Sequence, residues 1–185
     1  MIEQLSPPDV TAYLRSLRAV RRFSPTPVPD DVIRSILEVG RWTGSAKNTQ
    51  PWEFLVIRDR ATLKDLATLG QYAGHLAGAS FAILLVMRSR LDQLDCGRVA
   101  ERLMLAAWAH DVGSCIGSIF PDENESKAKD LLGVPPQREL HTAISFGYLA
   151  DSQATRLSST PGLAGVPLGR TPLAKIAHFE RYRAG

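Results

Sequence analysis

Two short stretches of the chain carry the residue types that could bind a polar ligand. The first, RAVRRF at residues 18–23, brings three guanidinium groups into six residues. Two or three such cations converging on one point are enough to hold the phosphate of a small ligand. The second, SAKNTQPW at residues 45–52, offers small residues, backbone N–H groups and side-chain amides to a flat polar molecule.

Each stretch also has a plain structural interpretation. The arginines, together with Arg15, could form the solvated face of a helix. The second stretch could be a loop that only connects a helix to a strand. Nucleic acid is a weaker alternative for the arginines, because no aromatic residues alternate with them to stack on bases and no recognised binding motif is present. We therefore predict no nucleic-acid partner.

The sequence holds no residue set suited to bond-making chemistry of its own. It has no HExxH, CxxC or GxSxG motif and no glycine-rich phosphate loop. The four histidines lie far apart and are expected to be packing or surface residues. Cys96 and Cys115 have no evident neighbouring base. We predict no metal and no catalytic side chain, so an enzyme built on this chain would depend on a cofactor for its reactive atoms.

Composition bounds the class of protein. The chain has 185 residues, is 44% hydrophobic and carries a net charge of +3, which predicts a single domain over residues 1–185 with a sizeable core. The longest apolar run, residues 81–87, is too short to cross a bilayer. Residues 1–10 lack the pattern of a signal peptide, and two cysteines support neither a disulfide framework nor a zinc site. The expected location is the cytoplasm, away from membranes.

Hydrophobic periodicity and turn residues predict the elements that must position the two stretches. Helices are expected over residues 8–17, 30–40, 61–70, 95–110, 127–132 and 172–181, and strands over residues 53–57, 80–87 and 141–148. Residues 71–78 read as a loop or broken helix, residues 113–118 as a tight segment of small residues, and residues 151–170 as a long polar connection. Because helices and strands do not alternate regularly, the predicted fold class is α+β.

The helix that begins at Asp95 is apolar nearly all round, with Leu103, Met104 and Trp108 on different sides. Such a helix is typical of a core or of a subunit interface.

Several motifs, taken in order, resemble the FMN-dependent nitroreductase family. They are RAVRRF (18–23), PVP (27–29), SAxNxQPW (45–52), DCGR leading into LMLAA (95–98 and 103–107), GSCIG (113–117), LLGVP (131–135), ISFGY (144–148) and GRTPL (169–173). Each motif alone is weak, but the ordered set covers almost the whole chain.

The resemblance implies an intertwined homodimer in which a mixed central β-sheet is wrapped by helices, in three layers, with two FMN sites at the subunit interface. It also implies that NAD(P)H donates a hydride to flavin N5 and that nitroaromatics, quinones or related compounds accept it in a ping-pong cycle. Protons can come from water, so no protein general base is required.

By position, the resemblance implies that Arg18 and Arg21 bind the FMN phosphate, with Arg22 as a further cation and Arg170 completing the clamp. Ala19 and Val20, in the same segment, are also assigned to cofactor binding.

The flavin ring is assigned to other residues. Ser45 and Asn48 would come from the partner subunit, while Gln50 would support their loop. Ile116 and Gly117 would run against the isoalloxazine, where low bulk permits close backbone approach. Gln71 would lie at the pyrimidine edge of the flavin.

The chain also departs from the family pattern. Ala19 stands where relatives commonly have Ser, Gly44 stands where they have Pro, and Asp111 stands where they have Gly. The connection from Met87 to Asp95 is too short for the helices that cover the flavin in larger relatives. These departures leave two alternatives open: an FMN-binding protein without reductase activity, acting as a flavin carrier or redox sensor, and a domain that has lost its flavin.

Overall fold

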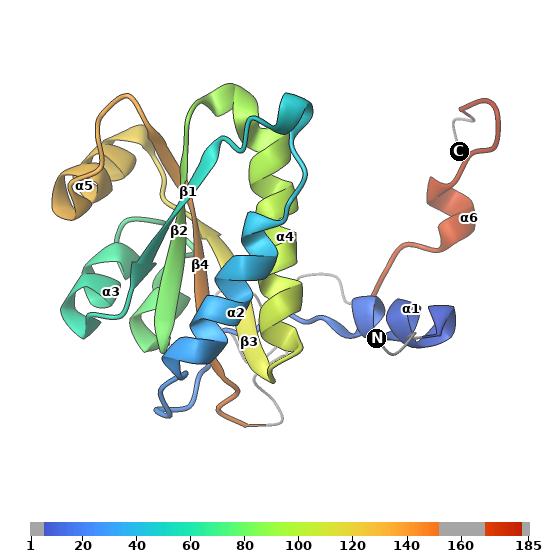
Figure 1. Ribbon diagram of the computed structural model, residues 1–185, viewed down its shortest axis with the longest axis horizontal. Coiled ribbons are helices and arrows are strands. Elements are labelled where there is room, and N and C mark those ends of the chain that lie inside the picture. Colours follow the sequence, from blue (N-terminus) through green and yellow to red (C-terminus); the bar gives the residue numbers. More distant parts are fainter. Residues whose placement is uncertain (1–5, 152–168, 183–185) are drawn as a thin grey trace. The chain divides into compact units, whose positions relative to one another are not determined.

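A four-stranded β-sheet forms the centre of the first of two units (Figure 1). The computed structural model describes residues 6–151 and 169–182, and the chain divides into one unit over residues 1–155 and a second over residues 156–185. The strands are β1 (Trp52–Ile57), β2 (Phe81–Met87), β3 (Val112–Ser118) and β4 (Glu139–Tyr148), in the spatial order β1-β2-β4-β3. β3 therefore lies at an edge of the sheet.

Every pairing between these four strands is antiparallel. Among the described residues, the parallel component of the predicted mixed sheet is an isolated bridge between Ala19 and Ser114.

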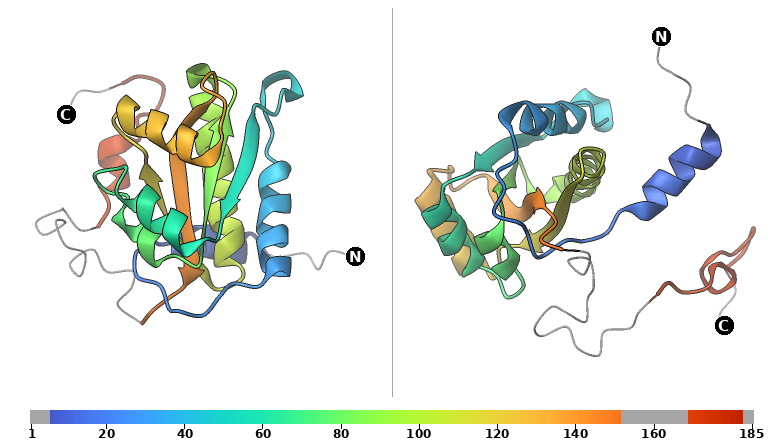
Figure 2. Two further views of the ribbon diagram at one scale, coloured as in Figure 1. Left: turned by 90° about the vertical axis from the view of Figure 1, so that its left-hand side faces the viewer. Right: turned by 90° about the horizontal axis from the view of Figure 1, so that it is seen from below.

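Helices cover both faces of the sheet, so the predicted three layers and the α+β class are confirmed (Figure 2). On one face lie α2 (Asp30–Arg41) and α4 (Gln93–Trp108), and on the other lie α3 (Arg60–Ala67), the 3₁₀ helix η2 (Gly74–Gly78) and α5 (Asp122–Leu132). The remaining elements are α1 (Pro7–Ser16), the 3₁₀ helices η1 (Ala46–Asn48) and η3 (Arg90–Asp92), and α6 (Leu173–Ile176) in the second unit. None of the helices described has the length and apolarity needed to cross a membrane.

β2 shows why the sheet needs both layers. All seven of its residues are buried, and successive side chains of a strand point to opposite faces. Phe81, Ile83 and Leu85 pack with α2 and α4, whereas Ala82, Leu84 and Val86 pack with α3 and η2. A continuous apolar run is thus the pattern of a strand covered on both sides.

The expectation of a tight segment at residues 113–118 is wrong, because these residues belong to β3. Glycine and serine have low strand propensity, but here their backbone pairs with β4 from Val112–Tyr148 to Ser118–Thr142. Long-range pairing outweighs the local preference.

Among the helix boundaries, two differ most from expectation. α5 begins at Asp122, ahead of the predicted start at residue 127, because carboxylates in its first turn favour the positive end of the helix dipole. The final helix is shorter than the predicted range 172–181 and covers Leu173–Ile176. Its apolar residues Leu173 and Ile176 are 74% and 61% exposed, so no core stabilises further turns. Most of the predicted connection over residues 151–170 lies outside the described residues.

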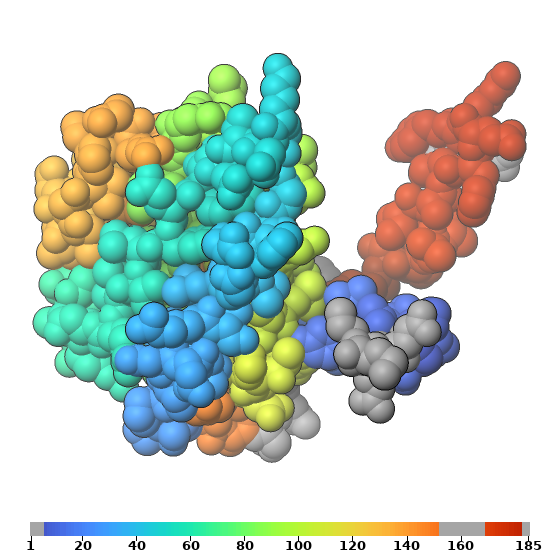
Figure 3. Space-filling view, in the orientation of Figure 1, coloured from blue at the N-terminus to red at the C-terminus, as the bar shows by residue number. Residues whose placement is uncertain are grey.

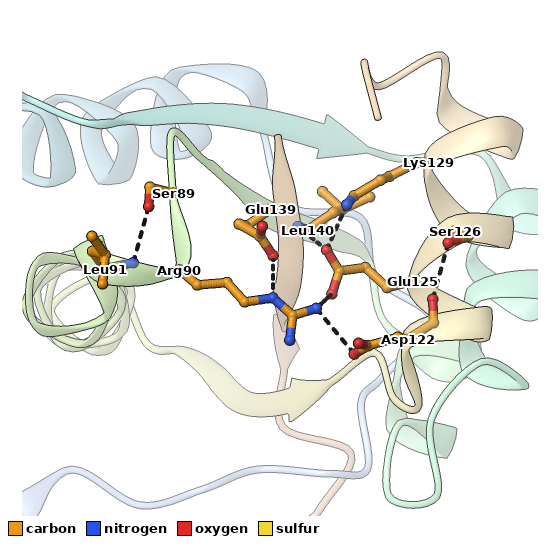
Figure 4. Close-up of polar contacts among 9 residues, drawn as sticks. All are labelled: Ser89, Arg90, Leu91, Asp122, Glu125, Ser126, Lys129, Glu139 and Leu140. Atoms are coloured by element: carbon orange, nitrogen blue, oxygen red, sulfur yellow. Dashed lines mark hydrogen bonds and ion pairs between the residues drawn. The ribbon is translucent and has the colours of Figure 1, made fainter. Parts of the chain in front are cut away.

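An ion-pair cluster ties α5 to β4 and to the connection before α4 (Figure 4). The exposed guanidinium of Arg90 lies 3.0 Å from Asp122, 2.9 Å from Glu139 and 3.8 Å from the buried carboxylate of Glu125.

Glu125 is the buried member of this cluster, with 2% of its surface exposed. Its Oε1 accepts from the backbone N–H of Leu140 at 2.8 Å and pairs with Lys129 Nζ at 2.8 Å. Burial alone would raise the pKa of Glu125, but Lys129, the Leu140 N–H and Arg90 together hold it below its ordinary value. The carboxylate is therefore charged in the folded protein near neutral pH.

Candidate functional site

The arginine-bearing stretch at residues 18–23 runs beside the edge strand β3. Ala19 forms a parallel bridge with Ser114, and the Val20 N–H donates to the Ser114 carbonyl at 2.8 Å. Val20 is fully buried against Gly113, where an added Cβ would lie 2.6 Å from a Val20 methyl group. The absence of a side chain at residue 113 is thus what allows this segment to dock.

Beyond Ser114, none of the described strands pairs with the outer edge of β3. In an antiparallel pair, alternate residues direct their N–H and C=O away from the partner strand. Ser114 does so, because it bonds Val20 on that side, and Ile116 and Ser118 follow the same alternation. Gly70 covers Ser118, since a Cβ there would lie 2.1 Å from the Ser118 carbonyl oxygen. Between these two contacts, Ile116 is 48% exposed, and its backbone groups face away from β4, with the carbonyl accepting from Cys115 Sγ at 3.6 Å.

The loop that leads into η2 lies against Gly117, next to Ile116. A Cβ added at Gly117 would lie 3.0 Å from His75 Nε2 and 3.7 Å from Ala73 Cα. Gln71 is exposed at the start of the same loop. The structure therefore brings Ile116, Gly117 and the Gln71 loop together.

His75 is the buried polar residue of η2. Its Nδ1 lies 2.7 Å from Ser145 Oγ, and its Nε2 is buried without a hydrogen-bond partner among the described residues. Burial, aided by the positive charge of Arg21, lowers the pKa of His75 to about 4. Sequence reasoning missed this residue, because only the folded chain brings the loop against Gly117.

The three guanidinium groups of the segment differ in their surroundings. Arg21 is half-buried, and its positive charge lowers the pKa of both His75 and the Cys115 thiol. Arg18 is exposed, and its Nη1 donates to the carbonyls of Arg15 and Leu17 at 2.7 and 2.9 Å.

Arg22 is already paired with a carboxylate. Its Nη2 lies 2.7 and 2.9 Å from the two carboxylate oxygens of Asp151. Arg170 belongs to the second unit, where its Nη1 donates to the Gly169 carbonyl at 3.0 Å. Its part in the predicted clamp stays a prediction.

The second stretch forms a tight, exposed loop that projects from the surface before β1 (Figure 3). Lys47, Asn48 and Gln50 all have positive φ, at 52°, 53° and 45°, a conformation that costs of order 1–3 kcal/mol for each non-glycine residue. Ser45 helps to hold it, because its Oγ accepts from the Gln50 N–H at 2.8 Å.

A cleft of about 500 Å³ adjoins this loop. Its walls include Ser45, Ala46, the apolar side chains of Leu91 and Leu94, and the ion pair between Arg98 and Asp95. Leu91 and Leu94 are 94% and 78% exposed.

The two stretches lie near opposite ends of α4. The Ser45 loop shares its cleft with Leu94 and Arg98 at the beginning of that helix. The segment before Arg18 contacts its end, where Trp108 Nε1 donates to Ser16 Oγ at 2.9 Å. A 16-residue helix is about 24 Å long. The residues assigned to one ligand therefore form two half-sites on a single chain.

The described residues include two buried thiols and no cluster of possible metal ligands. Among the described residues, no group of three or more histidine, cysteine or acidic side chains could hold a metal ion. Cys96 and Cys115 are buried free thiols, and burial raises the pKa of both, although Arg21 partly opposes the effect at Cys115.

The residues around the outer edge of β3 thus include Ile116, whose backbone groups face away from β4, the side-chain-free Gly117, and the buried His75, whose pKa the cation Arg21 helps to lower.

Comparison with known proteins identifies one family and related reductases and dehydrogenases. The profile of the Nitroreductase family matches residues 14–74 and 71–148. An Archaeoglobus fulgidus protein assigned as an NADH dehydrogenase/NAD(P)H nitroreductase is 32% identical over 74% of this chain and 83% of the relative. The NADH dehydrogenase of Thermus thermophilus is 37% identical over 90% of this chain and 93% of the relative.

The fold is likewise shared with solved structures. A Desulfovibrio desulfuricans protein assigned as a nitroreductase and solved in complex with FMN superposes with a TM-score of 0.77. It is 26% identical to this chain, and the match covers 97% of this chain and all of the other.

Proposed function

The chain belongs to the nitroreductase family, and from this premise we propose that it is an FMN-dependent oxidoreductase that uses NAD(P)H as electron donor. The relatives named NADH dehydrogenase and NAD(P)H nitroreductase, and the relative solved with FMN, support this assignment. One observation in the chain itself supports it: Ile116 directs its backbone groups away from β4, and it adjoins Gly117 and the Cys115 thiol, whose pKa the cation Arg21 lowers.

Bound FMN would supply the chemistry, taking a hydride from NAD(P)H at N5 and passing it to a nitroaromatic, a quinone or a related acceptor. The protein's part is to bind and to orient. Arg18 and Arg21 hold the phosphate through charge-assisted hydrogen bonds, with Arg170 as a third cation. Ile116 presents its N–H and C=O to the ring, and cations or N–H donors there favour the more negative, reduced ring.

Ser45 and Asn48 complete the site from the partner subunit of a homodimer. The separation of the two half-sites along α4 supports this arrangement, because one chain cannot place both stretches on one flavin without a large rearrangement. Donor and acceptor then occupy the same space above the ring in turn, which gives a ping-pong order.

The second candidate, a flavin carrier or redox sensor, is favoured by two features. Ala19 lacks the hydroxyl that would contact the phosphate, a loss of about 0.5–1.5 kcal/mol. The connection between β2 and α4 holds a short 3₁₀ helix, η3, and no larger cover.

An anaerobic experiment separates the candidates. Purified protein loaded with FMN is mixed with NADH or NADPH, and the flavin absorbance is followed before and after a nitroaromatic or quinone is added. We expect NAD(P)H to bleach the flavin and the acceptor to restore its absorbance, faster than free FMN does. A bound flavin that NAD(P)H never bleaches would favour the carrier or sensor. Protein that refuses FMN would leave a domain that has lost its flavin.

A further inference from the structure

Two leucines at the beginning of α4 stand outside the hydrophobic core. Leu91 in η3 and Leu94 in the first turn of α4 are 94% and 78% exposed, whereas Cys96 and Val99, a little further along the helix, are buried in the core. A single exposed leucine on a protein surface is ordinary. Two that line the same cleft form an apolar wall that a ligand can contact.

The short connection between β2 and α4 holds this wall in place. Ser89 Oγ accepts from the Leu91 N–H at 3.1 Å, and the Ser89 carbonyl accepts from the Asp92 N–H at 3.1 Å. The side chain of Arg90 is in turn held by its ion pairs with α5 and β4. The backbone that carries Leu91 is therefore anchored to neighbouring elements.

The opposite wall of the cleft is the loop that carries Ser45. Gly44, Ser45 and Ala46 contribute little side-chain bulk, and a Cβ at Gly44 would lie 3.2 Å from Arg98 Nη2. The space between the walls, about 500 Å³, falls in the range of sites that bind small molecules. Under the proposed function Ser45 borders the flavin bound by the partner subunit, so a cleft that shares Ser45 adjoins that flavin.

The charged groups of the cleft favour an uncharged ligand. Asp95 Oδ1 lies 3.3 Å from Arg98 Nη1, and Asp92 Oδ1 lies 3.2 Å from Arg88 Nη2. The lining thus includes two carboxylates and one guanidinium, and that guanidinium already has a carboxylate partner. An anionic ligand would meet net repulsion there, whereas an apolar ring can lie against the leucines.

We propose, resting on the proposed function that places Ser45 at the partner subunit's flavin, that Leu91 and Leu94 form the apolar wall of the acceptor site and favour uncharged aromatic acceptors over anionic ones. The two leucines determine which acceptor binds and take no part in hydride transfer. The connection from Met87 to Asp95 is too short for the covering helices of larger relatives, and its leucines provide an apolar cover in their place.

The first test measures binding without turnover. Wild-type protein loaded with oxidised FMN and labelled with ¹³C at its leucine methyl groups is titrated with nitrobenzene, which oxidised flavin does not reduce. The methyl resonances of Leu91 and Leu94 should shift as the aromatic ring approaches them, whereas those of Leu131, an exposed leucine of α5, should not. The anion 4-nitrobenzenesulfonate should produce smaller shifts at the same concentration.

The second test measures the reaction with an acceptor. Protein loaded with FMN is reduced anaerobically with dithionite and mixed with 1,4-naphthoquinone, which takes one hydride from the reduced flavin and one proton from water and leaves as the hydroquinone. Leu91→Ser and Leu94→Ser should each lower the second-order rate constant of flavin reoxidation about three- to tenfold, because each removes apolar contact with the ring. Leu131→Ser should leave it unchanged.

The outcomes separate this proposal from the proposed function. Unmoved Leu91 and Leu94 resonances in wild type, or unchanged rate constants in both variants, would overturn the acceptor wall while leaving the flavin site intact. Serine variants that melt at lower temperature and dissociate into single chains would show that a second copy of the chain covers the leucines, which would also overturn it. Failure of wild type to bind FMN, or of NAD(P)H to bleach the bound flavin, would instead overturn the proposed function.

Discussion

Arg18, Arg21 and Arg22 lie within five residues, yet their guanidinium groups differ in exposure and in hydrogen-bond partners. Arg18 donates to neutral carbonyls and is exposed. Arg21 is half-buried, and Arg22 is paired with the Asp151 carboxylate. A phosphate competes easily with carbonyl groups and water, but it must displace a carboxylate from Arg22. The resemblance assigns all three arginines to one phosphate clamp. Their surroundings predict that Arg18 and Arg21 are more available to a phosphate than Arg22.

This ranking predicts unequal losses of FMN affinity. Arg18→Ala and Arg21→Ala should each weaken binding by about 1.5–3 kcal/mol, the range for hydrogen bonds to a charged group. Arg22→Ala should cost less than about 1 kcal/mol, as for an exposed ion pair. Flavin fluorescence titration measures all three, with Arg34→Ala on the exposed face of α2 as the control. A larger loss in Arg22→Ala than in Arg21→Ala would contradict the ranking.

At the scale of elements, one buried carboxylate links α5 to β4, beside the apolar packing of Ala128 and Leu132 on the same face of the sheet. Glu125 satisfies a backbone N–H of β4 and the ammonium of Lys129 at once. The neighbouring ion pairs of Arg90 join the same elements, but its side chain is 60% exposed, so water and salt screen them.

Two substitutions at Glu125 should separate the contribution of its hydrogen bond with the Leu140 N–H from that of its ion pair with Lys129. Glu125→Ala leaves the buried Leu140 N–H and Lys129 unpaired, which should lower the free energy of unfolding by about 1–3 kcal/mol or slightly more. Glu125→Gln retains an acceptor for Leu140 and should lose less. Urea denaturation measures both, against Glu123→Ala, an exposed carboxylate on the same helix. Equal losses in the alanine and glutamine variants would show that the N–H contact contributes little.

Elements with a strong local pattern could be predicted from the sequence. β2 is a continuous apolar run, and α2 has a clear stripe ending at Gly40. β3 could not be predicted, because its glycine and serine residues become a strand only through pairing with β4. Prediction of the candidate site has the same limit. Residue types alone identified both stretches, but the contact of His75 with Gly117 depends on the fold and could not be predicted from the sequence.

At the scale of the whole molecule, the two half-sites predict how mutant chains behave when combined. One variant carries Arg18→Ala and Arg21→Ala, and the other carries Ser45→Ala and Asn48→Gly, glycine being chosen because residue 48 has positive φ. In the proposed homodimer, each variant alone has two damaged sites. A mixed dimer has one site in which all four side chains are native.

We therefore expect co-expression of the two variants to restore FMN binding that neither variant shows alone. Retained flavin per dimer, after purification through different tags on the two chains, is the measurement. Wild type carrying both tags is the control. If each chain builds a complete site by itself, the mixed sample will bind no more flavin than the average of its parents.

The covered edge of β3 has a consequence for solution behaviour. Exposed sheet edges invite pairing with other extended chains, and proteins protect them in various ways. Here Val20 closes one end and Gly70 the other, so a single residue, Ile116, is left open. An invading polypeptide needs several consecutive backbone partners, whereas a small rigid molecule needs one or two. We therefore expect this edge of β3 to resist pairing with a second extended chain.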